Sequence, residues 1–496
     1  MIVFDKDFKF GVSISGFQFE MGVSQDSIDK NSDWFLWVHD ALNIGGGIVS
    51  GDLPENGPGY WDLYEKDHEI MSNLGLGIVR IGIEWSRIFP NSTESISVNI
   101  EKNDQGDIVN IDIKETAIEK LKEFADKNAL SHYKKVITDL KNRGFTVMVN
   151  LNHFTLPLWI HNPVNVQRYK DGPYGWIDKK TVIEFVKYAG FLTRELSDTV
   201  DYWSTMNEPQ IVSSLGYLQP KTGFPPGVLN FDWYLLAQKN EAEAHVRAYD
   251  VMKKFTDKPI GIIYSFTPYT PLAEDDKDVL DNAMYFSNWH FMDMIVYGMI
   301  DDNLDGKKRE RKDMKGKLDF IGVNYYTRMM AQRNEKNRGI FNWSPVWGYG
   351  YACNGLEKSL SGRPVTDMGW EIYPEGIRDI TLSIKERYGD MPMFITENGV
   401  GEYTGKYIPY FIVSHLKSLH DAISNGAKIK AYMYWSFMDN YEWASGFSKR
   451  FGLLGINLQT KMRIPKPGYF IYREITKEHG IFDWMLEYVK DPYKLL

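Results

Sequence analysis

The sequence predicts an α/β fold, a single (β/α)8 barrel with long insertions in the loops that follow the strands. Short apolar, β-branched or aromatic runs recur along the chain, and longer amphipathic stretches separate them. Several of these stretches stop at a glycine just before the next run, as at Gly144 and Gly426, where a helix C-cap is typical. Strand and helix alternate in this way about eight times, which is typical of the barrel. An open doubly wound sheet is the alternative, but residues 13–18 (Ser-Ile-Ser-Gly-Phe-Gln) do not form its glycine-rich phosphate loop.

In the N-terminal half, four short runs have the composition of buried strands, because they are rich in apolar, β-branched or aromatic residues. The longer stretches at 131–143 and 181–196 are amphipathic and predict helices. The predicted strands of this half are residues 8–18, 78–85, 145–153 and 200–207.

The C-terminal half repeats the pattern with four more runs of the same kind. Between and around them, helical patterns occupy residues 233–254, 279–297, 374–388 and 408–424. The predicted strands of this half are residues 259–269, 318–326, 391–397 and 428–435.

The chain has 496 residues, more than a minimal barrel needs, yet no linker, repeat or low-complexity stretch divides it. Single barrels run from about 200 to more than 400 residues, so we expect one barrel domain over residues 1–496. The excess lies in residues 21–59, 91–128 and 328–371, each of which follows a predicted strand. We expect all three on the face where barrels build their active sites, with the charged stretch 91–128 as a solvated flap.

Composition argues against several classes of function. Lys and Arg total 57 against 66 Asp and Glu, a formal net charge of −9, which leaves no basic field for nucleic acid or an anionic membrane surface. No stretch approaches the roughly 20 apolar residues of a membrane span, and residues 1–7 do not resemble a secretory signal. Cys353 is the single cysteine, which rules out an intrachain disulfide and predicts a reducing, cytoplasmic location.

Polar and aromatic side chains collect at the ends of the predicted strands. In a barrel these ends converge on one cavity, and buried polar groups without partners are costly, so this concentration favours a site. The residues are Gln18, Glu84, Trp85, Asn152, His153, Asn207, Glu208, Asn324, Tyr326, Glu397, Asn398 and Trp435.

Two carboxylates stand out among these residues. Glu208 (in Asn-Glu-Pro) and Glu397 (in Glu-Asn-Gly) end the fourth and seventh predicted strands, roughly opposite each other across a small barrel. Paired carboxylates facing a cavity are the apparatus of glycoside hydrolysis, which needs a proton donor and a nucleophile or base. Each tripeptide alone could equally be strand-to-loop punctuation. Together, on correctly spaced strands and with His153 and Trp435 nearby, they favour the site.

The chain resembles glycoside hydrolase family 1, the retaining β-glycosidases, from its first strand to its last. The first matching motif, Gly-Phe-Gln-Phe-Glu-Met-Gly at residues 16–22, is similar to the archaeal β-galactosidase/β-glucosidase branch. The remaining motifs are residues 79–90 (Val-Arg-Ile-Gly-Ile-Glu-Trp-Ser-Arg-Ile-Phe-Pro), 151–159 (Leu-Asn-His-Phe-Thr-Leu-Pro-Leu-Trp), 322–326 (Gly-Val-Asn-Tyr-Tyr) and 434–447 (Tyr-Trp-Ser-Phe-Met-Asp-Asn-Tyr-Glu-Trp-Ala-Ser-Gly-Phe).

The resemblance implies a role for each motif residue. Glu208 matches the general acid/base and Glu397 the nucleophile. Arg80 and Tyr326 match the residues beside the nucleophile, and Asn324 resembles a supporting residue. The residues that match the sugar-binding set are Gln18, His153, Asn207, Trp435, Glu442 and Trp443. The resemblance implies no metal and no cofactor.

One departure within the family bears on the substrate. The 6-phospho-β-glycosidases carry Ser, Lys and Tyr for the phosphate, and this chain has Glu442, Lys449 and Phe451 at the matching places. Glu442 would repel a phosphate and suits the hydroxyls of a neutral sugar. The expected substrates are therefore unphosphorylated small oligosaccharides and aryl or alkyl β-glycosides, with a 6-phospho-β-glycosidase as the disfavoured alternative.

Two further functions are compatible with a barrel of this kind. A non-catalytic sugar-binding barrel would have no need for the pair Glu208 and Glu397, and transfer to a sugar instead of water is a third possibility. The resemblance also implies a homo-oligomer, a homotetramer. The apolar residues 484–489 (Trp-Met-Leu-Glu-Tyr-Val) could lie between subunits or pack back on their own barrel.

Overall fold

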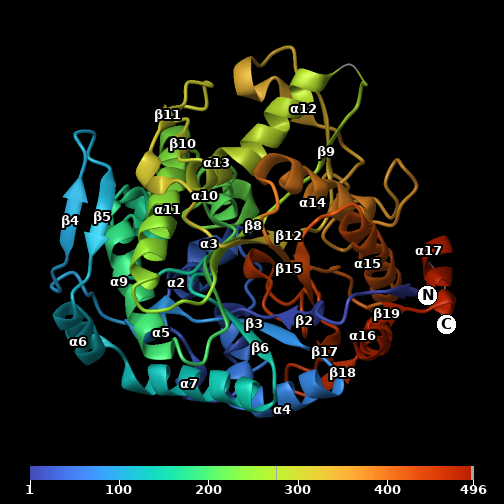
Figure 1. Ribbon diagram of the computed structural model, residues 1–496, viewed down its shortest axis with the longest axis horizontal. Helices are drawn as coiled ribbons and strands as arrows, with labels where there is room; N and C mark the ends of the chain where they lie inside the picture. Colours follow the sequence, from blue (N-terminus) through green and yellow to red (C-terminus); the bar gives the residue numbers. More distant parts are fainter. Residues whose placement is uncertain (275, 493–496) are drawn as a thin grey trace.

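The structure, a computed structural model that describes residues 1–274 and 276–492, is built on a closed barrel (Figure 1). Its eight strands are parallel, and each pairs with the next along the chain until β16 closes against β2. The predicted fold class is therefore confirmed. The barrel strands are β2 (Lys9–Ser13), β3 (Ile78–Gly82), β6 (Thr146–Asn150), β7 (Tyr202–Asn207), β8 (Ile260–Ser265), β12 (Phe320–Asn324), β15 (Met393–Asn398) and β16 (Ile429–Tyr434).

Apolar side chains fill the barrel, and amphipathic helices surround it. One buried cluster joins strands from all sides of the barrel and includes Met148, Phe320, Phe394 and Met433. The helices turn their apolar faces to the strands, as the 3.6-residue spacing predicts. They are α4 (Tyr60–Asn73), α7 (Lys127–Asn142), α9 (Lys179–Leu196), α11 (Phe231–Met252), α13 (His290–Val296), α14 (Glu375–Tyr388), α15 (Ile408–Ser424) and α16 (Pro467–Glu478). Helix α12 (Lys277–Met284) lies outside this ring, with Val279 and Ala283 packed against Ala331.

The predicted strands differ from the observed ones mainly at their C-terminal ends. Gln18 lies in the short helix α1 (Gly16–Phe19), and Trp85 begins another, α5 (Trp85–Ile88). The Phe17 N–H donates to Glu84 Oε1 instead of a neighbouring strand, so side chains replace the ladder at the mouth of the barrel. The predicted helix 279–297 is likewise interrupted by a π-helical turn, Tyr285–Trp289, between α12 and α13.

Two of the three insertions lie as expected, against segments that follow the C-terminal ends of barrel strands. In residues 21–59, α2 (Asp33–His39) places Trp34 against Trp443, with ring centroids 4.6 Å apart. In residues 328–371, strands β13 (Met329–Arg333) and β14 (Trp343–Pro345) form a small sheet with β9 (Tyr269–Pro271), the segment that follows β8.

The third insertion is not the solvated flap that its charge predicted. Its outer strand β4 (Asn99–Lys102) is exposed, but β5 (Ile108–Asp112) buries Ile108 and Ile111 against α11, and α6 (Glu115–Phe124) lies beside α9 (Figure 1). The hairpin therefore covers the outside of the helix ring. The prediction of a solvated flap was wrong because this charged stretch also contains apolar residues, such as Ile108 and Ile111, that form a buried inner face.

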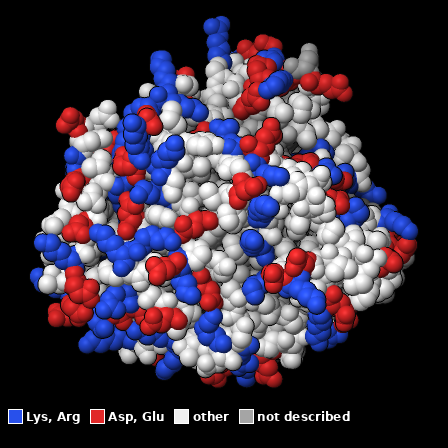
Figure 2. Space-filling model, in the orientation of Figure 1, with Lys and Arg blue, Asp and Glu red and all other residues white. Residues whose placement is uncertain are grey.

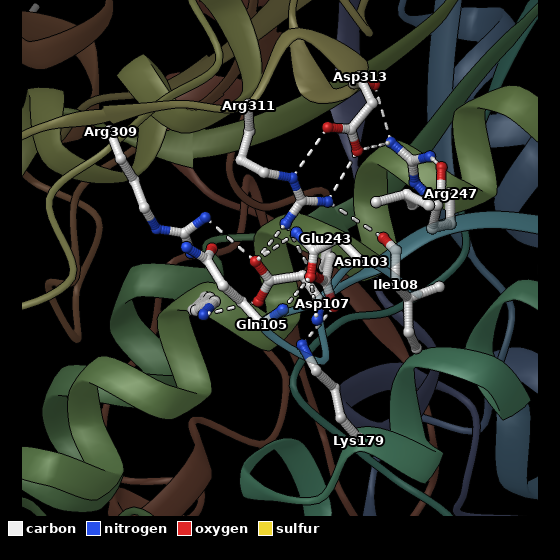
Figure 3. A network of polar contacts seen from close by, with 12 residues as sticks. Asn103, Gln105, Asp107, Ile108, Lys179, Glu243, Arg247, Arg309, Arg311 and Asp313 are labelled. Carbon is white, nitrogen blue, oxygen red and sulfur yellow. Dashed lines mark hydrogen bonds and ion pairs between the residues drawn. The ribbon is translucent and has the colours of Figure 1, made fainter. Parts of the chain in front are cut away.

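A buried ion-pair network fastens this hairpin (Figure 3). Arg311 Nη1 lies 3.0 Å from Asp107 Oδ2 and 3.3 Å from Glu243 Oε1, while Arg311 Nη2 donates to Ile108 O at 3.2 Å and to Asp313 Oδ2 at 2.7 Å. Burial raises the pKa of Asp107, but contacts with Lys239 and Arg309 outweigh it and hold that pKa well below its ordinary value. Asp107 is thus a charged group that depends on its cations, and Glu243 pairs with both Arg311 and Lys179.

We expect Arg311→Met to destabilise the protein without changing its substrate affinity. The variant leaves Glu243 and Asp107 buried with fewer partners, and breaking a buried pair costs about 3–5 kcal/mol. Thermal unfolding followed by circular dichroism should show a lowered midpoint. The control is Lys254→Met on the same face, because Lys254 pairs with Asp112 in solvent and exposed pairs contribute about 1 kcal/mol or less. Equal midpoints for the two variants would contradict a structural role for the network.

The N-terminal residues and the last described helix lie together, on the right in Figure 1. Strand β1 (Ile2–Val3) pairs with β19 (Gly480–Ile481), and the Met1 amino group lies 2.5 Å from Asp483 Oδ1. In residues 484–489, Met485 and Tyr488 are buried, and the short helix α17 (Glu487–Lys490) contacts α15. The tail therefore packs back on its own barrel, one of the two arrangements that its sequence allows.

The visible surface carries both signs of charge. In Figure 2, Lys and Arg gather together with Asp and Glu on the left, over the hairpin and α6, and uncharged surface covers much of the centre and right. This mixture gives no extended positive face of the kind that nucleic acid needs. None of the helices among the described residues has the length and apolar character required to cross a bilayer.

Candidate active site

The two carboxylates lie on facing parts of the barrel. Glu397 belongs to β15, and Glu208 directly follows β7. Glu208 has a left-handed backbone, with φ 49° and ψ 55°, and its N–H donates to Ile263 O at 2.8 Å. Pro209 then begins α10 (Pro209–Tyr217), since proline is favoured in a first helical turn. This turn ends the strand and leaves the Glu208 side chain buried in the barrel mouth.

Both oxygens of Glu397 accept a hydrogen bond. Arg80 Nη1 donates to Oε1 at 2.7 Å, and the Tyr326 hydroxyl donates to Oε2 at 2.6 Å. Arg80 is completely buried and belongs to β3, which lies between β2 and β6 in the barrel. A buried cation and a phenol thus orient a buried carboxylate, which fixes the direction of its lone pairs.

Asn324 and Asn207 connect this carboxylate to the other one. The Asn324 Nδ2 group donates to Asn207 Oδ1 at 3.0 Å and to Glu208 Oε1 at 2.7 Å. Arg80 Nη2 donates to the same Asn207 Oδ1 at 3.0 Å. Glu208, Asn324, Asn207, Arg80 and Glu397 therefore form one continuous hydrogen-bonded set, drawn from four different strands or their ends.

The surroundings of the two carboxylates differ, and they determine the protonation of Glu208. Burial raises the pKa of Glu208 to about 8, the negative charge of Glu397 adds to this rise, and the Asn324 hydrogen bond and Arg80 oppose it. Glu397 has its ion pair with Arg80. At neutral pH a protonated Glu208 therefore stands beside an ion-paired Glu397, an arrangement that can offer both a proton donor and a nucleophile.

The comparisons with known proteins agree with this geometry. The sequence model of "Glycosyl hydrolase family 1" matches residues 1–102 and 122–481. The chain belongs to glycosyl hydrolase family 1. It is 43% identical over 484 residues to a beta-galactosidase of Saccharolobus solfataricus, covering 97% of each chain, and 43% identical over 502 residues to a beta-galactosidase of Pyrococcus woesei, covering 97% of this chain and 98% of that one.

Solved structures of family 1 proteins superpose on the whole chain. The beta-glycosidase of Thermosphaera aggregans gives a TM-score of 0.93 at 39% identity, with 100% of each chain covered. The beta-glucosidase of Pyrococcus furiosus gives 0.91 at 42% identity, covering 98% of this chain and 99% of that one. The resemblance to the archaeal branch is confirmed, and the chain is an O-glycosyl hydrolase of family 1.

Gln18 is held where a family 1 sugar pocket is expected. Its Nε2 donates to Asn440 Oδ1 at 3.1 Å and to Tyr441 O at 3.0 Å, and lies 3.4 Å from Glu442 Oε2. Its Oε1 accepts from Ser15 at 2.8 Å. Burial raises the pKa of Glu442 to about 8, and the charge of Glu397 contributes to the rise. Gln18 and Glu442 thus place an amide and a carboxyl side by side, suited to a pair of sugar hydroxyls.

Three aromatic rings form a stack beside the carboxylates. The His153 ring lies 5.8 Å from both Trp435 and Trp443, nearly parallel to each. Burial and then the charge of Arg80 lower the pKa of His153 well below its ordinary value, so the imidazole is neutral. Its Nδ1 faces Arg80 Nη2 at 3.0 Å and must accept there, which puts the ring proton on Nε2.

The Nε2 proton of His153 lies beside the side-chain amide of Asn207. His153 Nε2 lies 3.5 Å from Asn207 Nδ2, and both groups are donors in this arrangement. Two neighbouring donors do not bond each other, so both can serve the hydroxyls of a sugar. The residues to which the resemblance gave a role are thus all placed, and the contacts bring them into one region. Among the other strand-end residues, Trp85 packs in the core against Tyr188, and the side chains of Asn152 and Asn398 donate to backbone carbonyls.

Lys449 and Phe451 both make contacts within the protein. Phe451 is buried, with its ring 6.0 Å from that of Tyr326 and 6.2 Å from that of Trp370. Lys449 donates through Nζ to Asp367 O. Phe451 is thus a neutral apolar residue, and the ammonium group of Lys449 is already engaged.

Sequence reasoning missed several contributors. Asn440, which accepts from Gln18, is two residues from Glu442 within the motif 434–447, so the motif contained a signal. Trp370 lies 5.4 Å from Tyr326, but it comes from the insertion 328–371 and follows no strand end. Glu84 stands at a predicted strand end without a predicted role, and it binds the Phe17 N–H and the Thr155 hydroxyl.

Proposed function

We propose that this protein is a retaining exo-β-glycosidase that hydrolyses terminal β-D-galactosides and β-D-glucosides through a covalent glycosyl-enzyme intermediate. The observation that carries the proposal is the buried, unlike pair of carboxylates: a Glu208 kept protonated by burial, and a Glu397 aligned by Arg80 and Tyr326. Relatives named beta-galactosidase and beta-glucosidase support the substrate class.

In the first step Glu208 gives its proton to the oxygen of the leaving group, while Glu397 attacks the anomeric carbon and forms an ester. The ester carries no negative charge, so the electrostatic part of the rise in the Glu208 pKa disappears. In the second step Glu208 accepts a proton from water, and the water breaks the ester. The configuration at the anomeric carbon is inverted twice and hence retained.

We further propose that the substrates are unphosphorylated. Glu442 is half-buried and lies 3.4 Å from Gln18 Nε2, and Phe451 offers no hydrogen bond to an anion. Gln18 and Glu442 serve the sugar hydroxyls, Asn207 and His153 donate to others, and the rings of Trp435 and Trp443 cover the apolar face of the sugar.

Turnover of 4-nitrophenyl β-D-galactoside and β-D-glucoside, with the configuration of the first product read by proton NMR, tests the proposal. We expect release of β-anomer from both compounds and none from 4-nitrophenyl 6-phospho-β-D-galactoside. An α-anomer as first product would contradict the retaining mechanism. A protein that binds sugar and releases no nitrophenol from acid to neutral pH would be a non-catalytic barrel.

The pH dependence of kcat/KM should follow the protonation of Glu208. Its pKa is raised to about 8, so the acid is present below that pH and is lost as the pH rises through it. For lactose, whose leaving group needs a proton, we expect kcat/KM to fall on the alkaline side near pH 8. Glu442 also has a pKa of about 8, so Glu442→Gln is the control. If kcat/KM of that variant no longer falls near pH 8 (the alkaline limb of the profile), the fall is caused by deprotonation of Glu442 and not of Glu208.

We also propose a homotetramer in the cytoplasm. One similar structure is that of a beta-glucosidase mutant derived from a hyperthermophilic tetrameric structure, and the single cysteine suits a reducing compartment. Closed symmetry is the usual outcome for soluble oligomers. Light scattering at micromolar concentration should give four times the chain mass of 57.5 kDa. A mass equal to one chain would refute the oligomer.

A further inference from the structure

Behind the two carboxylates lies a buried threonine that the mechanism has not used. Thr396 precedes Glu397 on β15, has no exposed surface, and donates from its hydroxyl to Asn324 Oδ1 at 2.7 Å. Asn324 is equally buried, and the other end of its carboxamide donates to Asn207 and Glu208. A single carboxamide thus separates Thr396 from the proton donor.

The orientation of the Asn324 carboxamide is determined from both ends. Asn207 Oδ1 already accepts from Arg80, so it is an acceptor, and Asn324 must turn its NH2 group toward it. The carbonyl oxygen of Asn324 then faces Thr396, whose hydroxyl supplies a donor. A buried amide oxygen without a donor costs about 1–3 kcal/mol, so the hydroxyl stabilises this orientation.

The methyl group of Thr396 keeps the hydroxyl in place. A Cβ atom built on Gly322, in the adjacent strand β12, would lie 3.1 Å from Thr396 Cγ2. The methyl group therefore shares with Ile263 the space that Gly322 leaves open, and the hydroxyl points to Asn324. The backbone of Thr396 is also fixed, because its carbonyl oxygen accepts from Ser13 Oγ at 2.5 Å and from Arg80 Nη1 at 3.3 Å.

The orientation of Asn324 affects which of the two carboxyl oxygens of Glu208 carries the proton. Oε1 accepts from Asn324, and in a protonated carboxyl the carbonyl oxygen is a better acceptor than the hydroxyl oxygen. The bond from Asn324 therefore favours the form of neutral Glu208 that carries its proton on Oε2. The same bond from Asn324 also favours the charged form that is needed after the proton has left.

We propose that Thr396 is a positioning residue for the acid/base: through the carboxamide of Asn324, its hydroxyl fixes which oxygen of Glu208 carries the proton. This inference rests on the proposed function of Glu208 as the proton donor. It adds a specific requirement, namely that a hydroxyl at position 396 is needed most when the leaving group needs protonation.

The test compares Thr396→Val, which keeps the shape and loses the hydroxyl, with Thr396→Ser, which keeps the hydroxyl. For Thr396→Val we expect kcat/KM on lactose to fall about tenfold, which corresponds to one buried hydrogen bond. Turnover of 2,4-dinitrophenyl β-D-galactoside, which needs little protonation, should change less than about threefold. The alkaline limb of the lactose profile should move to higher pH, because the bond that favours the charged form of Glu208 is weakened. Thr396→Ser should restore most of the lactose activity.

The control is Thr193→Val in α9, which removes an equally buried hydroxyl that donates to Ala189 O and should leave both substrates unaffected. Thr396→Ala replaces Thr396→Val if the valine variant does not fold. If Thr396→Val lowered kcat/KM equally on both substrates and left the alkaline limb in place, Thr396 would be a packing residue only. If kcat/KM and the alkaline limb of Thr396→Val were both unchanged, the inference would be wrong.

A second readout separates this inference from the proposed function. Infrared difference spectra between wild-type protein and Glu208→Gln follow the carboxyl band of Glu208 without any turnover. We expect the titration midpoint of that band to rise in Thr396→Val and to return in Thr396→Ser. If the wild-type protein hydrolyses neither galactoside, the proposed function fails, and the infrared midpoints still decide whether Thr396 acts on Glu208.

Discussion

Replacing Glu397 with glycine should lower hydrolysis by on the order of 10^5-fold, because the attacking carboxylate is gone. Azide or formate should restore part of the turnover of an activated aryl β-galactoside. A small anion can occupy the space of the missing side chain and attack the anomeric carbon from the same face. The product should have the α configuration, since only one displacement then takes place.

The design of this experiment must allow for the partners of Glu397. Arg80 is buried and would lose its ion pair, and breaking a buried pair costs about 3–5 kcal/mol. Thermal unfolding should therefore be measured first, and Glu397→Gln, which keeps the shape and accepts from Tyr326, serves as the control. Azide should not rescue Glu397→Gln, because its amide still fills the space. A rescued glycine variant that yields β product would show that another group is the nucleophile.

Replacing Glu208 with glutamine should slow substrates according to their leaving groups. For lactose or cellobiose we expect kcat/KM to fall by about 10^2–10^4-fold, the usual contribution of a general acid. For 2,4-dinitrophenyl glycosides the first step should be nearly normal. The second step still lacks its base, so the glycosyl-enzyme should accumulate and release nitrophenol in a burst. The alkaline limb near pH 8 should disappear as well.

Because glutamine has nearly the same shape as glutamate, a loss of activity in this variant can be assigned to the missing proton donor and base. Glutamine can still accept from Asn324 through its carbonyl oxygen, so the network around Asn207 should survive. An equal loss on lactose and on the dinitrophenyl compound would count against Glu208 as the acid. Azide should accelerate turnover of the dinitrophenyl compound with retained configuration, because it replaces water in the second step only.

The barrel could be predicted well from the sequence because its pattern is local. Short apolar runs and amphipathic stretches determine strands and helices within about 20 residues, and the eight predicted strands correspond to those of the closed barrel. The ends of the strands were predicted less well. Residues 15–18 leave the ladder, and Glu84, which lies 67 positions from Phe17 in the sequence, accepts the Phe17 N–H. That one barrel domain spans residues 1–496 stays a prediction.

The site could be predicted only in part, for a similar reason. Strand ends and motifs identified the polar residues that contact one another, and the fold brought them together. The roles assigned to them stay predictions until the variants are measured. The hydrogen-bond directions that give Asn324 its orientation depend on Thr396 and Asn207, which approach it from two other strands. No spacing in the sequence contains that information.

The hairpin on the outside of the barrel is held by contacts that are separate from those of the two carboxylates. Its contacts run to α9, α11 and residues 309–313, whereas the bonds that hold Glu208 and Glu397 run inside the barrel. Residues 103–121, which include Asp107 and Ile108, also fall between the two segments that match the family model. We therefore expect substitutions there to change heat tolerance through contacts that the two carboxylates do not share. An engineer can use the same separation, exchanging the hairpin between relatives to adjust heat tolerance without selecting again for activity.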